Sequence, residues 1–130
     1  MSEQAHRTLI YAEEVFRIQG AVFEVYRRMG AGFLEAVYQE CLGREFSFRG
    51  IPFKALQSLP LSYREETLKT SYIADFVVFD TIILELKAVR ALAPEHRAQT
   101  INYLRSTGMR LGLLLNFSAV LRVAIERFAV

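Results

Sequence analysis

Cysteine and long apolar runs are both scarce in this 130-residue sequence. The single cysteine, Cys41, excludes an internal disulfide bond and a cysteine-rich zinc site, and it fits a reducing intracellular compartment. The longest late apolar run, from Leu111 to Phe117, is far too short to cross a bilayer, and no apolar signal segment follows the polar start of the chain. We therefore expect a cytoplasmic protein that makes no membrane contact.

A large net charge is also missing. The formal charge of +2 and the pI near 8.8 permit nucleic-acid binding but do not predict it, because dedicated DNA-coating proteins are usually more basic. Gly30 and Gly32 do not mark a phosphate loop, because no Gly-Lys-Ser/Thr follows them. With 52% hydrophobic and 23% charged residues and no internal repeat, we expect residues 1–130 to form a single globular domain with a substantial core.

The most informative segment runs from Ile73 to Ala88. It is strongly apolar and β-branched, which predicts two buried strands joined by a tight connection around residues 79–81. Asp75 and Glu85 are equally far from Asp80, so a hairpin symmetric about Asp80 places these two acids opposite each other. The strand period of two puts Lys87 on the same face as Glu85.

Charged groups in such a strand pair need a physical reason. Desolvating them without partners costs several kcal/mol each, and facing carboxylates repel, so a divalent metal ion is the partner that best explains Asp75 and Glu85. The alternative is a structural α/β protein in which the Glu-x-Lys pattern forms ion pairs or a solvated face. That alternative predicts the two carboxyl groups turned apart, each with its own basic partner.

The remaining pattern predicts a helix from about Thr8 to Met29, a second helix from Phe33 to Phe48 and a third from Pro94 to Thr107. Strands are expected at Ser58–Tyr63, in both arms of the hairpin, and at Leu111–Phe117 and Leu121–Phe128, with a loop over Arg64–Thr67. Pro60 marks the first strand as an edge strand. The fold class is therefore α/β (α+β), with the element order ααβββαββ.

Polar side chains on two of these helices are further candidates. Glu35 lies in the first turn of the second helix, where an acid also complements the helix dipole. His96, Gln99 and Tyr103 share one face of the third helix. That face is either a substrate-facing edge or the border of an amphipathic helix.

Three motifs occur in order along nearly the whole chain: Gly32-Phe-Leu-Glu35-Ala-Val-Tyr38, then Asp75 followed by Glu85-Leu86-Lys87, then Gln99-Thr-Ile-Asn-Tyr103. Together they resemble the motifs of the GxxExxY proteins, a branch of the PD-(D/E)XK nuclease superfamily. The first matches the motif that names the branch, the second matches the nuclease signature, and the third resembles the Gln-xxx-Tyr helix motif of RecB-like nucleases. The chain departs from the pattern at Ala74, where a proline is common, and at Ile73 and Tyr26, where many relatives have a basic residue and a histidine.

The resemblance implies a restriction-endonuclease-like core in which a central mixed β-sheet is flanked by helices. It implies that Asp75, Glu85 and the backbone carbonyl of Leu86 hold Mg²⁺ or Mn²⁺, the ions that suit hard oxygen ligands. Lys87 would orient the attacking water or stabilise charge on the phosphate. Glu35 would act as a further acid toward a second ion.

The resemblance also implies a substrate. Gln99 and Tyr103 would position a nucleic-acid backbone, with His96 and Tyr38 as additional substrate-binding residues. We expect a metal-dependent endo- or exonuclease that acts on DNA in preference to RNA, with a homodimer or a larger protein partner as the source of any sequence specificity. The alternative from another class is a catalytically silent nucleic-acid-binding or protein-interaction module on the same fold.

Overall fold

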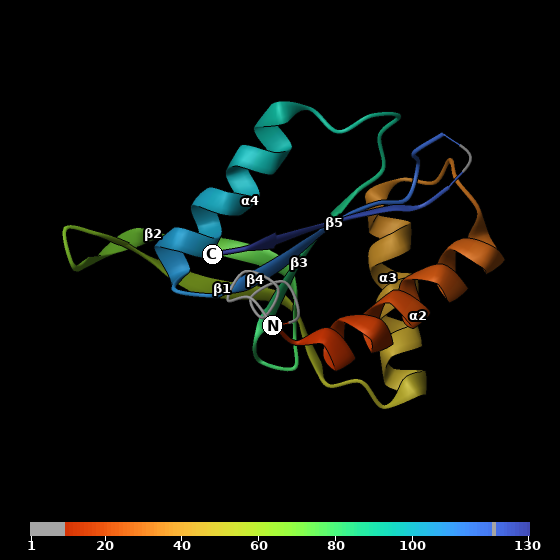
Figure 1. Ribbon diagram of the computed structural model, residues 1–130, viewed down its shortest axis with the longest axis horizontal. Coiled ribbons are helices and arrows are strands. Elements are labelled where there is room, and N and C mark those ends of the chain that lie inside the picture. Colours follow the sequence, from red (N-terminus) through yellow and green to blue (C-terminus); the bar gives the residue numbers. More distant parts are fainter. Residues whose placement is uncertain (1–9, 121) are drawn as a thin grey trace, which may run out of the picture.

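The computed structural model describes residues 10–120 and 122–130. Helices and strands follow the predicted order ααβββαββ (Figure 1). The elements are α2 (Ala12–Met29), α3 (Glu35–Arg49), β1 (Phe53–Tyr63), β2 (Glu66–Val78), β3 (Ile82–Lys87), α4 (Pro94–Thr107), β4 (Leu111–Asn116) and β5 (Ala124–Ala129).

One five-stranded sheet organises the molecule, and its spatial order is β1-β2-β3-β4-β5. β3 and β4 run parallel, whereas every other neighbouring pair is antiparallel. The parallel pair requires a crossover, which α4 supplies. β3 therefore lies at the centre of a mixed sheet, and its neighbour β4, from the segment predicted to form a central buried strand, is buried throughout.

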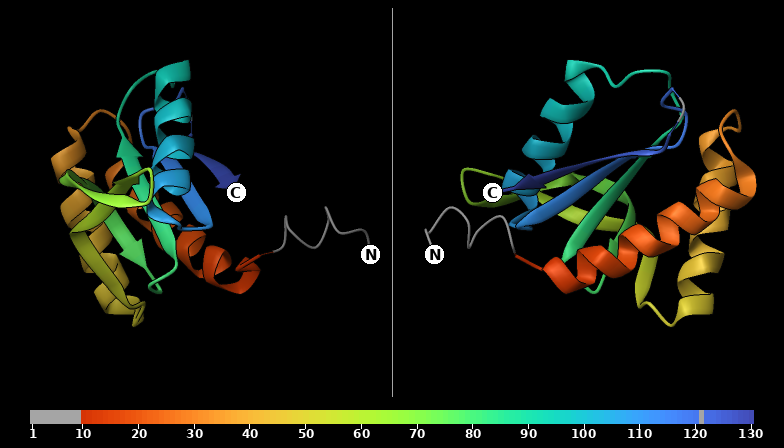
Figure 2. Two further views of the ribbon diagram at one scale, coloured as in Figure 1. Left: turned by 90° about the vertical axis from the view of Figure 1, so that its left-hand side faces the viewer. Right: turned by 45° about the vertical axis from the view of Figure 1, so that its right-hand side comes forward.

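Helices cover both faces of this sheet. α2 and α3 pack on one face against a core that includes Phe76, Ile82 and Leu84. α4 packs on the other face through Leu104 against Val77 and Ile83. The right view of Figure 2 shows the strands between α4, in cyan, and the helices α2 and α3, in orange to yellow. Alternate residues of β3 thus face different helices, so Ile83 and the odd-numbered residues after it point to the α4 side.

Local sequence explains the helix boundaries. The buried stripe of α2 repeats at helical spacing over Val15, Ile18 and Val22, and the helix ends at Gly30. Gly50 and Gly108 end α3 and α4 in the left-handed conformation that favours glycine. In the part of the chain that the structure describes, no helix is long and apolar enough to span a membrane.

Several predicted boundaries were wrong by a few residues. α2 begins at Ala12, α3 begins at Glu35, and the earlier predicted start of α2 at Thr8 lies outside the described residues. β1 begins at Phe53 because it pairs with the full length of β2 rather than with its first half. The loop between β1 and β2 is shorter than the predicted Arg64–Thr67: it is a turn at residues 64–65, both of which have positive φ. β5 spans Ala124–Ala129, and the predicted start at Leu121 also lies outside the described residues.

The register of the central hairpin was predicted correctly. β2 pairs with β3 through Val78 with Ile82, Val77 with Ile83 and Phe76 with Leu84, which is symmetric about Asp80. Phe79 and Asp80 both adopt positive φ, as a tight hairpin turn requires. The residues that come next in this register are Asp75 and Glu85.

Candidate active site

Asp75 and Glu85 lie together where the β2–β3 ladder ends. The backbone N–H of Asp75 donates to Oε1 of Glu85 at 3.4 Å, and the N–H of Leu86 donates to Oδ2 of Asp75 at 2.8 Å. Carboxylate oxygens therefore take the places that backbone carbonyls would occupy in a continuing ladder. The two strands separate here with an acid on each.

Asp75 also sits at an irregularity in the β1–β2 pair. Ala55 pairs with Phe76 and Gln57 pairs with Ala74, but Leu56, which would face Asp75, has a φ of 51° and takes no part in the ladder. The carbonyl of Asp75 instead accepts a hydrogen bond from Nε2 of Gln39 in α3 at 2.9 Å. Side chains thus bind both backbone polar groups of Asp75, which frees this residue from the regular pleat.

The electrostatics of the pair fit a cation site. Burial, followed by the neighbouring charge of Asp75, raises the pKa of Glu85 from 4.5 to about 7, although a hydrogen bond from Tyr72 and the charge of Lys87 act in the opposite direction. Among the described residues, no lysine or arginine nitrogen lies within 4.0 Å of either carboxylate. The ion-paired alternative required such basic partners, and the described chain does not provide them.

Tyr72 is a contact of Glu85 that the sequence did not predict. Its hydroxyl donates to Oε1 of Glu85, and its ring stacks on Tyr103 of α4, with centroids 3.7 Å apart and 10° between the ring planes. Burial and the charges of Glu85 and Asp75 raise the pKa of Tyr72 far above its ordinary value, so the hydroxyl remains a donor. Tyr103, the tyrosine of the Gln-xxx-Tyr motif, is thus linked to Glu85 by the ring of Tyr72.

Lys87 follows at the end of β3, on the α4 side of the sheet like Glu85. Alternation in β3 buries Leu84 and Leu86 on the opposite side, as expected. Lys87 pairs in parallel register with Asn116, whose side chain is 1% exposed. Oδ1 of Asn116 accepts from the N–H groups of Val89 and Ser118, at 3.0 and 3.2 Å, and so ties together the segments that leave β3 and β4. This second unpredicted residue fixes the end of the strand that carries Lys87.

Glu35 lies near this site but outside the acid pair. It is the exposed first residue of α3, one helical turn before Gln39, which contacts Asp75. Among residues 10–120 and 122–130, no group of three or more His, Cys, Asp or Glu side chains is close enough to hold a metal ion. The structure therefore brings together Asp75 and Glu85 and leaves Glu35 outside their cluster.

Two predicted substrate-binding residues make contacts within the protein. Tyr38 is completely buried, stacks on Phe117 at 4.4 Å, and its hydroxyl donates to the carbonyl of Gly30 at 2.5 Å. It has no exposed surface with which to contact a substrate, so we correct its expected role to a structural one. His96 accepts the N–H of Ala93 through Nδ1 at 3.1 Å, which caps the start of α4. Gln99 is exposed on α4, one turn before Tyr103.

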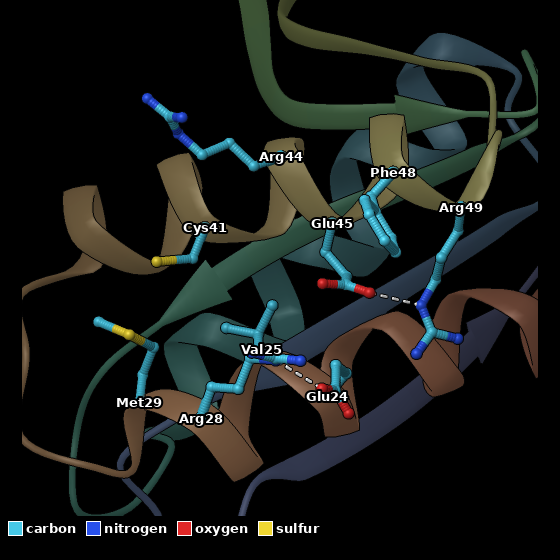
Figure 3. A pocket seen from close by; sticks show the side chains of 9 residues that line it. All are labelled: Glu24, Val25, Arg28, Met29, Cys41, Arg44, Glu45, Phe48 and Arg49. Atoms are coloured by element: carbon cyan, nitrogen blue, oxygen red, sulfur yellow. Dashed lines mark hydrogen bonds and ion pairs between the residues drawn. The ribbon is translucent and has the colours of Figure 1, made fainter.

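A large hollow lies elsewhere and does not include these residues. It has a volume of about 620 Å³ and is formed by α2 and α3 (Figure 3). The side chains around it come from the helices on the other side of the sheet, and they include the ion pairs Glu24–Arg28 and Glu45–Arg49. This hollow is thus separate from the acid pair.

Two solved structures are similar to this chain. The crystal structure of SSO0001 has a TM-score of 0.56 and 16% identity, and covers 73% of this chain and 50% of its own. An alkaline exonuclease, LHK-Exo from Laribacter hongkongensis, has a TM-score of 0.48 and 14% identity, with 67% and 51% covered. The chain therefore spans about half the length of these proteins, and at such identities the first likeness supports the fold alone. No curated protein matches the sequence.

The family comparison covers more of the chain. Residues 12–128 match the model of the PD-(D/E)XK nuclease superfamily. The matched region contains both strands that carry the acid pair, as well as α4 and the sheet around them. Because the match extends over nearly the whole chain, the protein belongs to the PD-(D/E)XK nuclease superfamily.

Proposed function

We propose that this protein is a metal-dependent nuclease that hydrolyses phosphodiester bonds of nucleic acid, with DNA preferred over RNA. The observation that carries the proposal is the pairing of Asp75 with Glu85 at a strand end, without a basic partner in the described chain and with Lys87 on the same face. Two half-buried acids in this arrangement are costly unless a cation joins them. Membership of a nuclease superfamily supports phosphodiester chemistry at this site.

The residues present fit a hard divalent cation. Asp75 Oδ1 and Glu85 Oε2 accept no hydrogen bond from the described residues, so one oxygen of each acid is available. We assign these oxygens and the backbone carbonyl of Leu86 as ligands, with waters completing the shell of Mg²⁺ or Mn²⁺. Members of this superfamily typically use divalent metals. A thiolate or imidazole set suited to zinc is missing from the described part of the site.

Each residue then has a role in the chemistry. A bound ion would supply Lewis-acid polarisation of the scissile phosphate. Asp75 and Glu85 would hold it, and the ammonium group of Lys87 would orient the attacking water or stabilise charge on the phosphate oxygens. We assign Glu35, one turn from Gln39 on α3, to a second ion, which it would reach through water. Gln99 and Tyr103, on the α4 side, contact the nucleic-acid backbone, and His96 borders that surface.

The finer assignment follows the same residues. We place the chain in the GxxExxY branch because Gly32, Glu35 and Tyr38 occur at the spacing that names it. Tyr38 supports this assignment structurally, since its hydroxyl closes the turn between α2 and α3 that precedes Glu35. A homodimer or a larger partner would supply sequence specificity, because the single domain offers little surface beyond its core.

The test is a cleavage assay on single- and double-stranded DNA and RNA with Mg²⁺ or Mn²⁺. Asp75→Asn, Glu85→Gln and Lys87→Ala should each lower the rate by a factor of about 100 or more. Asp80→Asn and Lys54→Ala are matched controls, because Asp80 lies in the same hairpin and forms only an exposed ion pair with Lys54 at 3.5 Å. The controls should cleave like the wild type.

Metal binding separates the nuclease from a silent module. A saturating ion at about 100 times its Kd should raise the free energy of unfolding by about 2.7 kcal/mol in the wild type and not in Asp75→Asn. Stabilisation by Mn²⁺ with no cleavage of any substrate favours the catalytically silent binding module. Cleavage that persists unchanged in Glu85→Gln or Lys87→Ala would refute the proposal.

A further inference from the structure

Two side chains outside every recognised motif hold the acid pair from opposite sides. Tyr72 of β2 binds the carboxylate of Glu85, and Gln39 of α3 binds the backbone of Asp75. We propose that Tyr72 and Gln39 are positioning residues that set the two acids in the orientation needed to share one divalent cation. The inference rests on the proposed function and adds two residues to it.

Tyr72 restricts the longer and more mobile of the two acids. A glutamate side chain has three rotatable bonds, so Glu85 has many orientations in which it points away from Asp75. The Tyr72 hydroxyl and the Asp75 N–H both donate to Oε1, which fixes this oxygen and leaves Oε2 for a cation. Tyr72 itself is only 5% exposed, and the stack with Tyr103 prevents its ring from turning.

Gln39 has the equivalent task for Asp75. Because Leu56 leaves the β1–β2 ladder, the backbone at Asp75 is not held by a regular strand partner. The amide of Gln39 compensates by binding the Asp75 carbonyl at 2.9 Å, across the interface between α3 and the sheet. With the backbone fixed there, Oδ2 accepts the Leu86 N–H at 2.8 Å and Oδ1 remains available.

The two contacts act on a pair that would otherwise separate. Facing carboxylates repel each other, so without these donors the metal-free site would relax into orientations that do not share a ligand. Metal binding would then be weakened by the free energy needed to bring the two carboxylates back together. Partners of metal-ligating side chains typically contribute a factor of 10–100 to metal affinity. We expect the loss of either contact to weaken Mn²⁺ binding by about that factor while the fold persists.

The experiment uses variants that delete one donor each. Tyr72→Phe keeps the ring and its stack on Tyr103, and Gln39→Leu keeps the approximate volume. Tyr63→Phe, at an exposed tyrosine of β1, and Gln19→Leu, on α2, are the matched controls. Two measurements are made on each protein: the Kd for Mn²⁺ by calorimetry, and the crystal structure of the metal-free form. Circular dichroism checks that each variant is folded.

The expected result is a Kd for Mn²⁺ about 10–100 times higher in Tyr72→Phe and Gln39→Leu, unchanged in the controls. In the metal-free crystals, Glu85 Oε1 should leave the Asp75 N–H in Tyr72→Phe, and the Asp75 backbone should shift in Gln39→Leu. A folded Tyr72→Phe with wild-type Kd and an unmoved Glu85 overturns the inference while the nuclease proposal stands. If the wild type binds no Mn²⁺, the nuclease proposal fails, and the metal-free structures alone decide whether the two residues position the acids.

Discussion

The metal-free protein should become more stable when its proposed metal ligand Glu85 is replaced by glutamine. Burial and the nearby charge of Asp75 raise the pKa of this carboxyl from 4.5 to about 7. The folded state therefore holds the proton more tightly than the unfolded state does. Between about pH 4.5 and 7 the unfolded chain ionises first, so the free energy of unfolding falls as the pH rises through this range and is constant above it.

The size of the effect follows from the shift in pKa. A shift from 4.5 to about 7, at about 1.4 kcal/mol for each pH unit, corresponds to a loss of roughly 3 kcal/mol at pH 8. Glutamine does not ionise, so the free energy of unfolding of Glu85→Gln does not fall through this cause between pH 4.5 and 8. The carbonyl oxygen of the glutamine can still accept the hydrogen bond from Tyr72. Its NH₂ group can donate a hydrogen bond to Asp75, which removes the repulsion between two negative charges.

Urea denaturation in the presence of a chelator measures this directly. The wild type and Glu85→Gln should have similar free energies of unfolding near pH 5, and the variant should be more stable by roughly 3 kcal/mol at pH 8. Glu66→Gln, at an exposed acid of β2, is the control and should follow the wild type at both values. Mn²⁺ at about 100 times its Kd should stabilise the wild type by about 2.7 kcal/mol and so remove most of this difference, because only the wild type binds the ion. Equal stability of wild type and Glu85→Gln at pH 8 without metal would refute the electrostatic account of the site.

Two other predictions concern the framework of the site. Tyr38→Phe should lower the free energy of unfolding by about 1–2 kcal/mol, because the Gly30 carbonyl loses its hydrogen-bond donor. The cleavage rate of the folded variant should equal that of the wild type. A large loss of cleavage rate in a fully folded variant would show that Tyr38 is a substrate-binding residue. Gly112→Ala should destabilise the protein by about 1–3 kcal/mol in thermal denaturation, because a Cβ there would lie 3.3 Å from Leu104 and Thr100 of α4. Its control, Gly43→Ala, adds a Cβ at an ordinary 3.7 Å from Phe76 and should not destabilise.

The sequence predicted the parts of the site that obey regular strand geometry. The closeness of Asp75 to Glu85 follows from a symmetric hairpin, and the position of Glu85 and Lys87 on one side of β3 follows from a period of two. These inferences succeed because a tight turn fixes the register of both arms at once. Pro60 was placed on an edge strand for an equally local reason, since it lacks an N–H to donate.

The residues that the sequence did not reveal depend on an irregularity. Tyr72 and Asp75 are three positions apart in the sequence, so regular alternation would place them on opposite faces of the sheet. The alternation of β2 is broken at Asp75, opposite Leu56, because Val77 packs in the same cluster as Tyr72, and both Tyr72 and Asp75 reach Glu85. No composition signal marks a leucine that adopts a left-handed conformation. Gln39 was missed for a related reason: its partner is a backbone carbonyl, which no motif specifies.

The interruption at Leu56 also has a consequence for solubility. β1 is the outermost strand on its side, and an uninterrupted strand there would offer a row of free backbone groups to the same edge of another molecule. Leu56 breaks that row near one end, and Pro60 together with the register shift between Pro60 and Ser62 breaks it again farther along. The same kink that releases Asp75 from the pleat thus makes the border of the sheet a poor template for fibre growth.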